Sequence, residues 1–135
     1  MTDQDTLLDI DFNGDEDFEL KTLPASTEVT LRIKSAATKI ASTGSKMIAL
    51  ILEDPSDPHV DDIYHNVNLP DARKKIEDPK KFIKALRRVK DFYICFGIAT
   101  DSPVSIRDLV GCEGRVIVGE EEYEGKVRNK IIKFL

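Results

Sequence analysis

The chain offers few side chains that could support catalysis. Nucleophilic catalysis needs a serine or cysteine beside a base, together with a group that orients the base. His59 and His65 are the two histidines of the chain, and no nucleophile-elbow motif accompanies either of them. The sequence therefore predicts no catalytic residues and a protein that is not an enzyme.

Metal-binding patterns are equally scarce. Cys95 and Cys112, like the two histidines, lack the paired spacing of zinc ligands. The acidic stretch 53–62 lacks the glycine and the closing glutamate of a calcium loop. The Gly-x-x-Gly pattern at 111–114 precedes a predicted strand, which indicates a turn rather than a clamp on a nucleic-acid backbone. We expect no metal and no cofactor.

What remains is a mixture of cations, tyrosines and amides on the polar faces of predicted strands. Single-stranded nucleic acid needs this mixture, because cations neutralise phosphates, aromatic rings stack on bases and amides bond to base edges. The predicted phosphate contacts are Arg32, Lys34, Lys39, Lys46, Arg128 and Lys130, with Lys126 beside them in the last hairpin. The predicted base contacts are Tyr64 and Tyr123, which would stack, and Asn66 and Asn129, which would form hydrogen bonds. For each single residue, an ordinary solvent-facing position on a strand is the alternative.

These residues belong to strands that the hydrophobic pattern predicts. From Thr27 onward Val29, Leu31, Ile33 and Ser35 alternate with polar residues, which predicts a strand with one buried face. A turn at 42–45 leads to a second strand at 46–53, which is apolar on both faces and is therefore expected to be covered on both. A third strand is predicted at 62–69, a fourth at 115–122 and a fifth at 127–135.

A single long helix is predicted between the third and fourth strands, followed by a short helical or turn piece from Ser105 to Leu109. Asp78 is a suitable N-cap before Pro79, and Gly97 is a suitable C-terminal stop. One apolar stripe runs along it, formed by Phe82, Leu86, Val89, Tyr93 and Phe96. The opposite face is basic, which indicates a solvated face or a second phosphate-binding surface. This element order predicts a mainly β fold, a five-stranded OB-fold-like Greek-key barrel with one α-helix between strands 3 and 4.

The charge of the chain is unevenly distributed. Twenty Lys and Arg face 25 Asp and Glu, but residues 1–19 carry eight of the acids and no base. Residues 20–135 therefore sum to about +3 by formal count. We predict an acidic N-terminal arm at 1–20 and one binding domain at 21–135. The arm is either a solvated tail or a segment that competes with an anionic ligand or docks on a partner protein.

Composition also limits the class of protein. At 41% hydrophobic and 33% charged residues, the chain is expected to fold as one soluble domain. No apolar run approaches the ~20 residues of a membrane-spanning helix, and no signal pattern begins the chain. The two cysteines indicate a reducing compartment rather than a disulfide framework. We expect a cytoplasmic protein with no membrane partner.

The chain resembles the phage-type single-stranded DNA-binding proteins of the OB-fold class from about Leu23 to Leu135. The segments that carry the resemblance are Leu23-Pro24, Thr38-Lys39, Lys46-Met47, Ile63-Tyr64-His65-Asn66, Leu109-Val110-Gly111 and the run from Glu121 to Asn129. The resemblance implies a sequence-independent binder of single-stranded DNA in phage replication or recombination, acting in the host cytoplasm. Many such proteins end in an acidic tail that recruits replication enzymes, whereas this chain ends in a strand-like apolar segment. The N-terminal arm is therefore the candidate contact for replication or recombination proteins.

Three questions stay open from the sequence. A protein-interaction or adaptor module on an OB-like barrel, without nucleic acid, is the alternative function. RNA as the ligand is a further option, because the sequence holds no recognisable reader of the 2′-hydroxyl. A homodimer is also compatible with the sequence, since exposed strand edges can pair between subunits.

Overall fold

The structure is a computed structural model that describes residues 19–135, so residues 1–18 of the predicted arm lie outside it. Within this range no helix is both long and apolar enough to cross a membrane. In chain order the elements are β1 (Thr27–Ile40), β2 (Lys46–Glu53), β3 (Ile63–Asn68), α1 (Lys74–Glu77), α2 (Pro79–Cys95), α3 (Ile106–Leu109), β4 (Glu113–Tyr123) and β5 (Lys126–Phe134).

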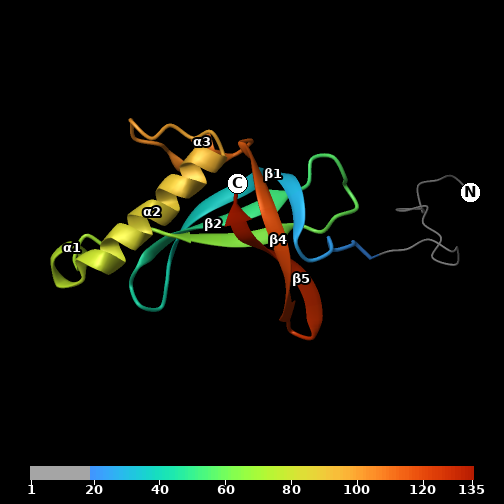
Figure 1. The fold of residues 1–135 in the computed structure, drawn as a ribbon, viewed down its shortest axis with the longest axis horizontal. Helices are drawn as coiled ribbons and strands as arrows, with labels where there is room; N and C mark the ends of the chain where they lie inside the picture. Colours follow the sequence, from blue (N-terminus) through green and yellow to red (C-terminus); the bar gives the residue numbers. More distant parts are fainter. Residues whose placement is uncertain (1–18) are drawn as a thin grey trace, which may run out of the picture.

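The strands form one antiparallel sheet in the order β3-β2-β1-β4-β5 (Figure 1). The fold is therefore mainly β, as predicted, with five strands in the expected sequence order. No hydrogen-bonded ladder joins β3 to β5 in the described sheet, so these strands are its two edges. The edges nevertheless face each other, because the ring of His65 in β3 meets Phe134 in β5 edge-on, with centroids 5.5 Å apart.

Strand β1 is long and pairs with two different strands along its length. Its first part, from Thr27 to Arg32, pairs with β4, and its second part, from Arg32 to Ile40, pairs with β2. A register shift between Ile33 and Ser35 lies close to this change of partner. A bulge adds one residue to a strand and so reverses the alternation of its faces. The prediction that Ser35 continues the buried face of Ile33 is wrong for this reason, and Ser35 is exposed.

Local signals placed the main helix correctly. The carboxylate of Asp78 accepts a hydrogen bond from the backbone N–H of Lys81, and Pro79 opens α2. Gly97 ends it with a positive φ of 66°, a conformation that glycine adopts without steric cost. The short piece predicted at Ser105 to Leu109 is the one-turn helix α3, whereas the one-turn helix α1 before α2 was not predicted.

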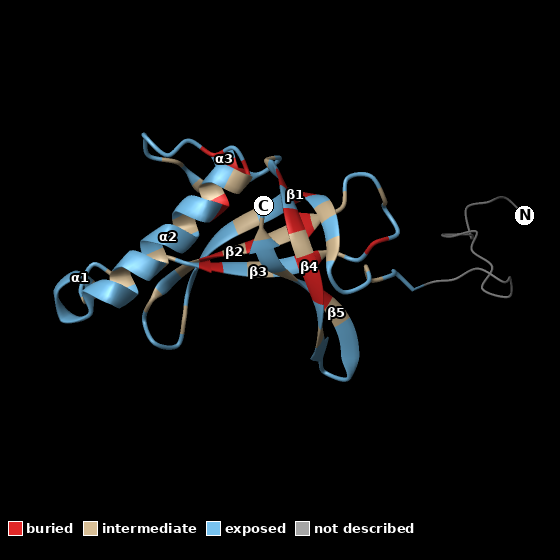
Figure 2. Ribbon diagram, viewed as in Figure 1, coloured by how far each residue is buried: buried red, intermediate tan, exposed pale blue. Residues whose placement is uncertain are grey.

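One hydrophobic core lies between the inner face of the sheet and the C-terminal part of α2 (Figure 2). Phe92 is fully buried there, although the predicted stripe omitted it. Leu86, which the stripe included, is 46% exposed. The reason is that only the C-terminal end of α2 meets the sheet, while its N-terminal part projects from the body (Figures 1 and 2).

Candidate nucleic-acid interface

The outer face of β1, β2 and β3 forms a nearly flat floor. Strand register aligns Ser35 with Ile51 and Ile51 with Tyr64, so these three side chains form one row across the sheet. The next row consists of Ala37, Ala49 and Asn66. Three of these six side chains, Ser35, Ala37 and Ala49, are small and leave space above the sheet for a planar ligand. The expectation that β2 is covered on both faces is wrong, since Ala49 and Ile51 are only half-buried.

A groove of about 840 Å³ lies between this floor and the β4–β5 hairpin. Six of the predicted binding residues line it: Lys39, Tyr64, Asn66, Tyr123, Lys126 and Arg128. They come from three separate stretches of sequence and meet only in the fold. The rings of Tyr64 and Tyr123 are 59% and 52% exposed, so both present a face on which a planar group can stack.

Arg128 connects the hairpin to this surface. Its Nε donates a hydrogen bond to Glu121 Oε1 at 2.8 Å across the β4–β5 ladder. Its guanidinium carbon lies 3.8 Å from the centroid of the Tyr123 ring. This cation–π contact holds the two side chains together, so the hairpin presents an ordered pair of planar groups rather than two independent ones.

Two predicted phosphate contacts are engaged elsewhere. Arg32 donates from Nε and Nη2 to Glu53 Oε2 at 3.1 and 3.0 Å. Lys34 donates to Asp62 Oδ2 at 2.9 Å, and this hydrogen bond raises the pKa of the Lys34 amine above its ordinary value. Neither residue lines the groove. Their charges are therefore largely balanced by partners before any phosphate arrives.

Asn129 is not available to a ligand. It is buried in β5, where Nδ2 donates to the carbonyl oxygens of Leu23 and Gly119 at 2.8 and 3.1 Å. Its Oδ1 accepts from the backbone N–H of Leu23 at 2.8 Å. The predicted base contact of Asn129 is thus replaced by a structural role, because its position in β5 faces inward.

The two other predicted cations lie outside the groove. Lys46 opens β2 and borders a separate hollow of about 290 Å³ near the β1–β2 turn. Lys130 is exposed on β5, two residues beyond Arg128. The structure therefore brings six of the eleven predicted residues together.

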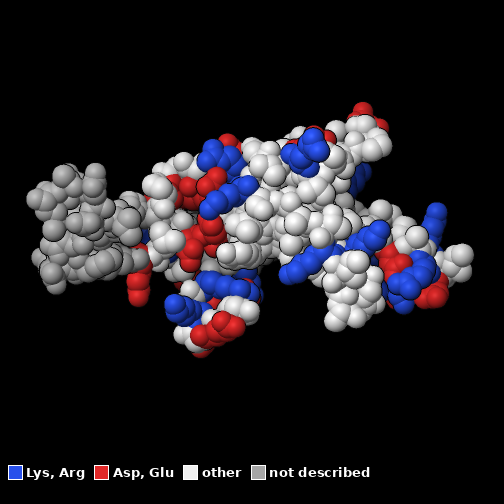
Figure 3. All heavy atoms as spheres, turned by 180° about the vertical axis from the view of Figure 1, so that it is seen from behind, with Lys and Arg blue, Asp and Glu red and all other residues white. Residues whose placement is uncertain are grey.

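Acidic residues that sequence analysis missed share the groove. Asp61, Asp62 and Glu124 line it together with the cations. On the side of the molecule drawn in Figure 3, Lys and Arg likewise alternate with Asp and Glu rather than forming one basic patch. Only the fold brings Asp61 and Asp62 into one groove with Lys126 and Arg128, whereas Glu124 lies two residues from Lys126 in the sequence. The groove is consequently mixed in charge and rich in planar groups.

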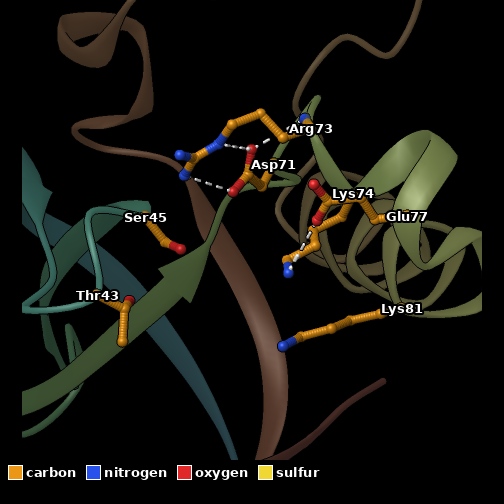
Figure 4. Close-up of a pocket in the computed structure, with 7 residues that line it drawn as sticks. All are labelled: Thr43, Ser45, Asp71, Arg73, Lys74, Glu77 and Lys81. Carbon is orange, nitrogen blue, oxygen red and sulfur yellow. Dashed lines mark hydrogen bonds and ion pairs between the residues drawn. The ribbon is translucent and has the colours of Figure 1, made fainter.

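A second cleft, of about 380 Å³, lies between the β1–β2 turn and the start of the helical region (Figure 4). Arg73 pairs with Asp71 at 2.9 Å, and Lys74 pairs with Glu77 at 3.3 Å. Lys81 extends toward this space, and its amine forms no ion pair within the described residues. The cleft could therefore take one phosphate beside Lys81, but it lacks the stacking surface of the groove.

Other site chemistries are not apparent in residues 19–135. No group of three or more metal-ligating side chains comes together there. Cys95 and Cys112 are free thiols, and burial raises the pKa of Cys95, which disfavours its reactive thiolate. A scan of protein-family models found no match to the chain, and neither did a search of curated proteins.

Proposed function

We propose that this chain binds single-stranded DNA in the groove between the outer face of β1–β3 and the β4–β5 hairpin. The observation that carries the proposal is the convergence of two exposed tyrosines, one amide and three cations around the outer face of β1–β3. Bases would stack on Tyr64 and Tyr123, while Lys39, Lys126 and Arg128 face the phosphates. Stacking is indifferent to base identity, so the binding would not depend on sequence.

The proposed architecture is an OB-fold-like Greek-key barrel. The strand order, the helical connection between β3 and β4 and the approach of His65 to Phe134 support this assignment. OB-folds bind oligonucleotides on the face of strands 2 and 3 and between the hairpin loops, which is where the groove lies here. With the sequence resemblance, this supports a non-catalytic role in phage DNA replication or recombination in the host cytoplasm.

Fluorescence anisotropy tests the proposal directly. A labelled ~30-nucleotide oligo-dT exceeds one OB site of ~4–16 nucleotides and is compared with oligo-rU and a duplex of equal length. Tight binding to oligo-dT, weak binding to duplex and a loss of affinity with salt are expected. The absence of oligo-dT binding at low salt would overturn the proposal, and a preference for oligo-rU would reassign the ligand to RNA.

Variants locate the site. Tyr64→Ala should weaken oligo-dT binding by ~1–3 kcal/mol, whereas Tyr64→Phe, which keeps the ring, should not. Lys126→Ala should lower the salt slope by about one unit, because one phosphate contact is lost. Lys133→Ala removes an equal charge from a residue that does not line the groove and is the matched control. If Lys133→Ala matches Lys126→Ala, the groove is not the site.

A protein-interaction module is the second candidate. The acids that line the groove, Asp61, Asp62 and Glu124, favour it because they repel a polyanion. A peptide that carries both charges and an apolar side chain would complement this mixed surface. Failure of oligo-dT binding together with capture of a protein partner that Tyr64→Ala abolishes would establish this function instead.

A further inference from the structure

The side of α2 opposite the core residue Phe92 carries a face that nothing in residues 19–135 covers. Ile83, Leu86 and Ile94 are 47%, 46% and 62% exposed, and Ile76 of the adjoining α1 is 90% exposed. Helical spacing places Ile83 beside Leu86 on the side away from the core residue Phe92. Exposed large apolar side chains grouped on one helix face indicate a contact surface.

The same face is basic. Lys80, Arg87 and Lys90 lie one helical turn from Ile83 or Leu86, so cations and apolar side chains alternate on it. Among the described residues, the side chains of α2 form no ion pair that would neutralise these cations. We call the surface of Lys80, Ile83, Leu86, Arg87, Lys90 and Ile94 the α2 face.

The N-terminal arm has the complementary composition. Residues 1–19 hold eight acids and no base, and in the stretch 9–20 the acids alternate with Ile10, Phe12, Phe18 and Leu20. A segment of this kind can bring carboxylates to the cations of the α2 face and apolar side chains to its isoleucines and leucine. We propose that the arm of one copy of the chain docks on the α2 face of a second copy.

The place where the described chain begins favours a second copy over the arm's own helix. Near this start Lys21 bridges to Val60 and forms an ion pair with Asp57 at 2.7 Å. The start of the described chain, blue in Figure 1, lies at the opposite end of the described molecule from α1 and the start of α2. An arm at one end and its receptor at the other form a head-to-tail contact, which extends from copy to copy.

The groove is a poorer receptor for the arm. Asp61, Asp62 and Glu124 line it and would repel the acidic arm, whereas α2 contains a single acid, Asp91, which lies one helical turn from Arg87 at the border of the α2 face. The inference goes beyond DNA binding and does not depend on it.

Sedimentation of the full chain without DNA tests the contact. At low salt the average mass of the wild type should rise above 15.2 kDa with concentration and fall back when salt is added. An arm variant, with Asp9, Asp11, Asp15 and Asp17 changed to Asn, should stay monomeric. A helix variant, with Lys80→Glu, Arg87→Glu and Lys90→Glu, should also stay monomeric.

Mixing separates this contact from a general charge effect. The arm variant keeps its α2 face and the helix variant keeps its arm, so an equimolar mixture should form one-to-one pairs of twice the monomer mass. A groove variant, with Lys39→Glu and Lys126→Glu, reverses cations outside the α2 face and should associate like the wild type. Its association is expected to survive even where its DNA binding is lost.

Three results would overturn the proposal. A wild type that is monomeric at every concentration excludes the contact between copies. An arm that covers the helix of its own chain would give this result. Association that persists in the helix variant places the interface elsewhere, for instance at the edges of the sheet. Association that is lost in the groove variant places the arm in the groove.

Discussion

The guanidinium of Arg128 lies over the ring of Tyr123, 3.8 Å from its centroid, while Nε of the same residue donates to Glu121. Both contacts join β4 to β5 next to the turn, so they order the tip of the hairpin that borders the groove. One face of Tyr123 is taken by Arg128, which leaves the ring edge and the other face for a ligand. The cation thus positions the stacking residue.

This pair makes a prediction about conservative substitutions. Arg128→Lys keeps the charge but loses the planar group and the Nε–H, so it should weaken oligo-dT binding nearly as much as Arg128→Ala. Tyr123→Phe keeps the ring and should bind like the wild type. Tyr123→Leu should weaken the free energy of oligo-dT binding by ~1–3 kcal/mol, as measured by anisotropy. Wild-type affinity in Arg128→Lys would show that only its charge matters.

Two of the predicted binding residues, Asn129 and Asn66, should differ in their effects on stability and on oligo-dT binding. Asn129→Ala leaves the backbone groups of Leu23 and Gly119 without their partner, which should lower the free energy of unfolding by ~1–3 kcal/mol. Asn66→Ala, at an exposed position in the groove, should leave stability unchanged and weaken oligo-dT binding. Urea unfolding and anisotropy on both variants check this, and equal effects on stability would contradict it.

The elements themselves followed from local sequence signals. The second strand was predicted with its observed bounds, and Asp78, Pro79 and Gly97 marked the ends of α2 because caps act within a few residues. Strand alternation likewise placed Tyr64 and Asn66 on the outer face of β3, where the structure has them. Such signals depend only on neighbours in the chain.

The predictions that were wrong concern features that depend on contacts between distant segments of the chain. The bulge that turns Ser35 outward comes from the passage of β1 between two partners, which no local pattern encodes. Helical periodicity gave an apolar stripe but not how much of it meets the sheet, so Leu86 was expected inside and Phe92 was missed. Asp61 and Asp62 were not predicted to line the groove, because the tertiary fold brings them to the same groove as Lys126 and Arg128.

Two glycines of β4 should tolerate a methyl group differently. A Cβ at Gly114 would lie 2.7 Å from Cδ1 of Phe96, a ring that is buried and packed on Phe92 with centroids 5.2 Å apart. Gly114→Ala should therefore lower the free energy of unfolding by ~1–3 kcal/mol, because the ring has no room to move. Urea unfolding measures this change.

Gly119→Ala is the matched control for this substitution. Its Cβ would meet Cγ2 of Ile132 at 2.9 Å, but Ile132 is 52% exposed and can rotate away. The loss should therefore be clearly smaller than at Gly114. If the two variants lose equal stability, the packing of Phe96 against Gly114 is not the reason that Gly114→Ala destabilises the fold.

His65 should make stability depend on pH in a narrow window. Burial against Phe134 lowers the pKa of its imidazole below the ordinary value of 6.5, so the folded chain holds the ring neutral. Between the two pKa values the unfolded chain binds more protons, and stability rises with pH. The contribution of His65 to the free energy of unfolding should therefore be fully present above the unfolded pKa of about 6.5 and be lost as the pH falls below it.

Substitution of each histidine assigns this dependence. His65→Leu removes the titrating group and should flatten the stability profile just below about pH 6.5, and His65→Gln gives the same readout if the leucine variant folds poorly. His59→Gln changes an exposed loop histidine and should keep the wild-type slope. Carboxylates such as Asp57, whose pKa is lowered by its hydrogen bond from Lys21, act at lower pH and do not obscure the window. A slope that survives in both His65 variants would assign the pH dependence to another group.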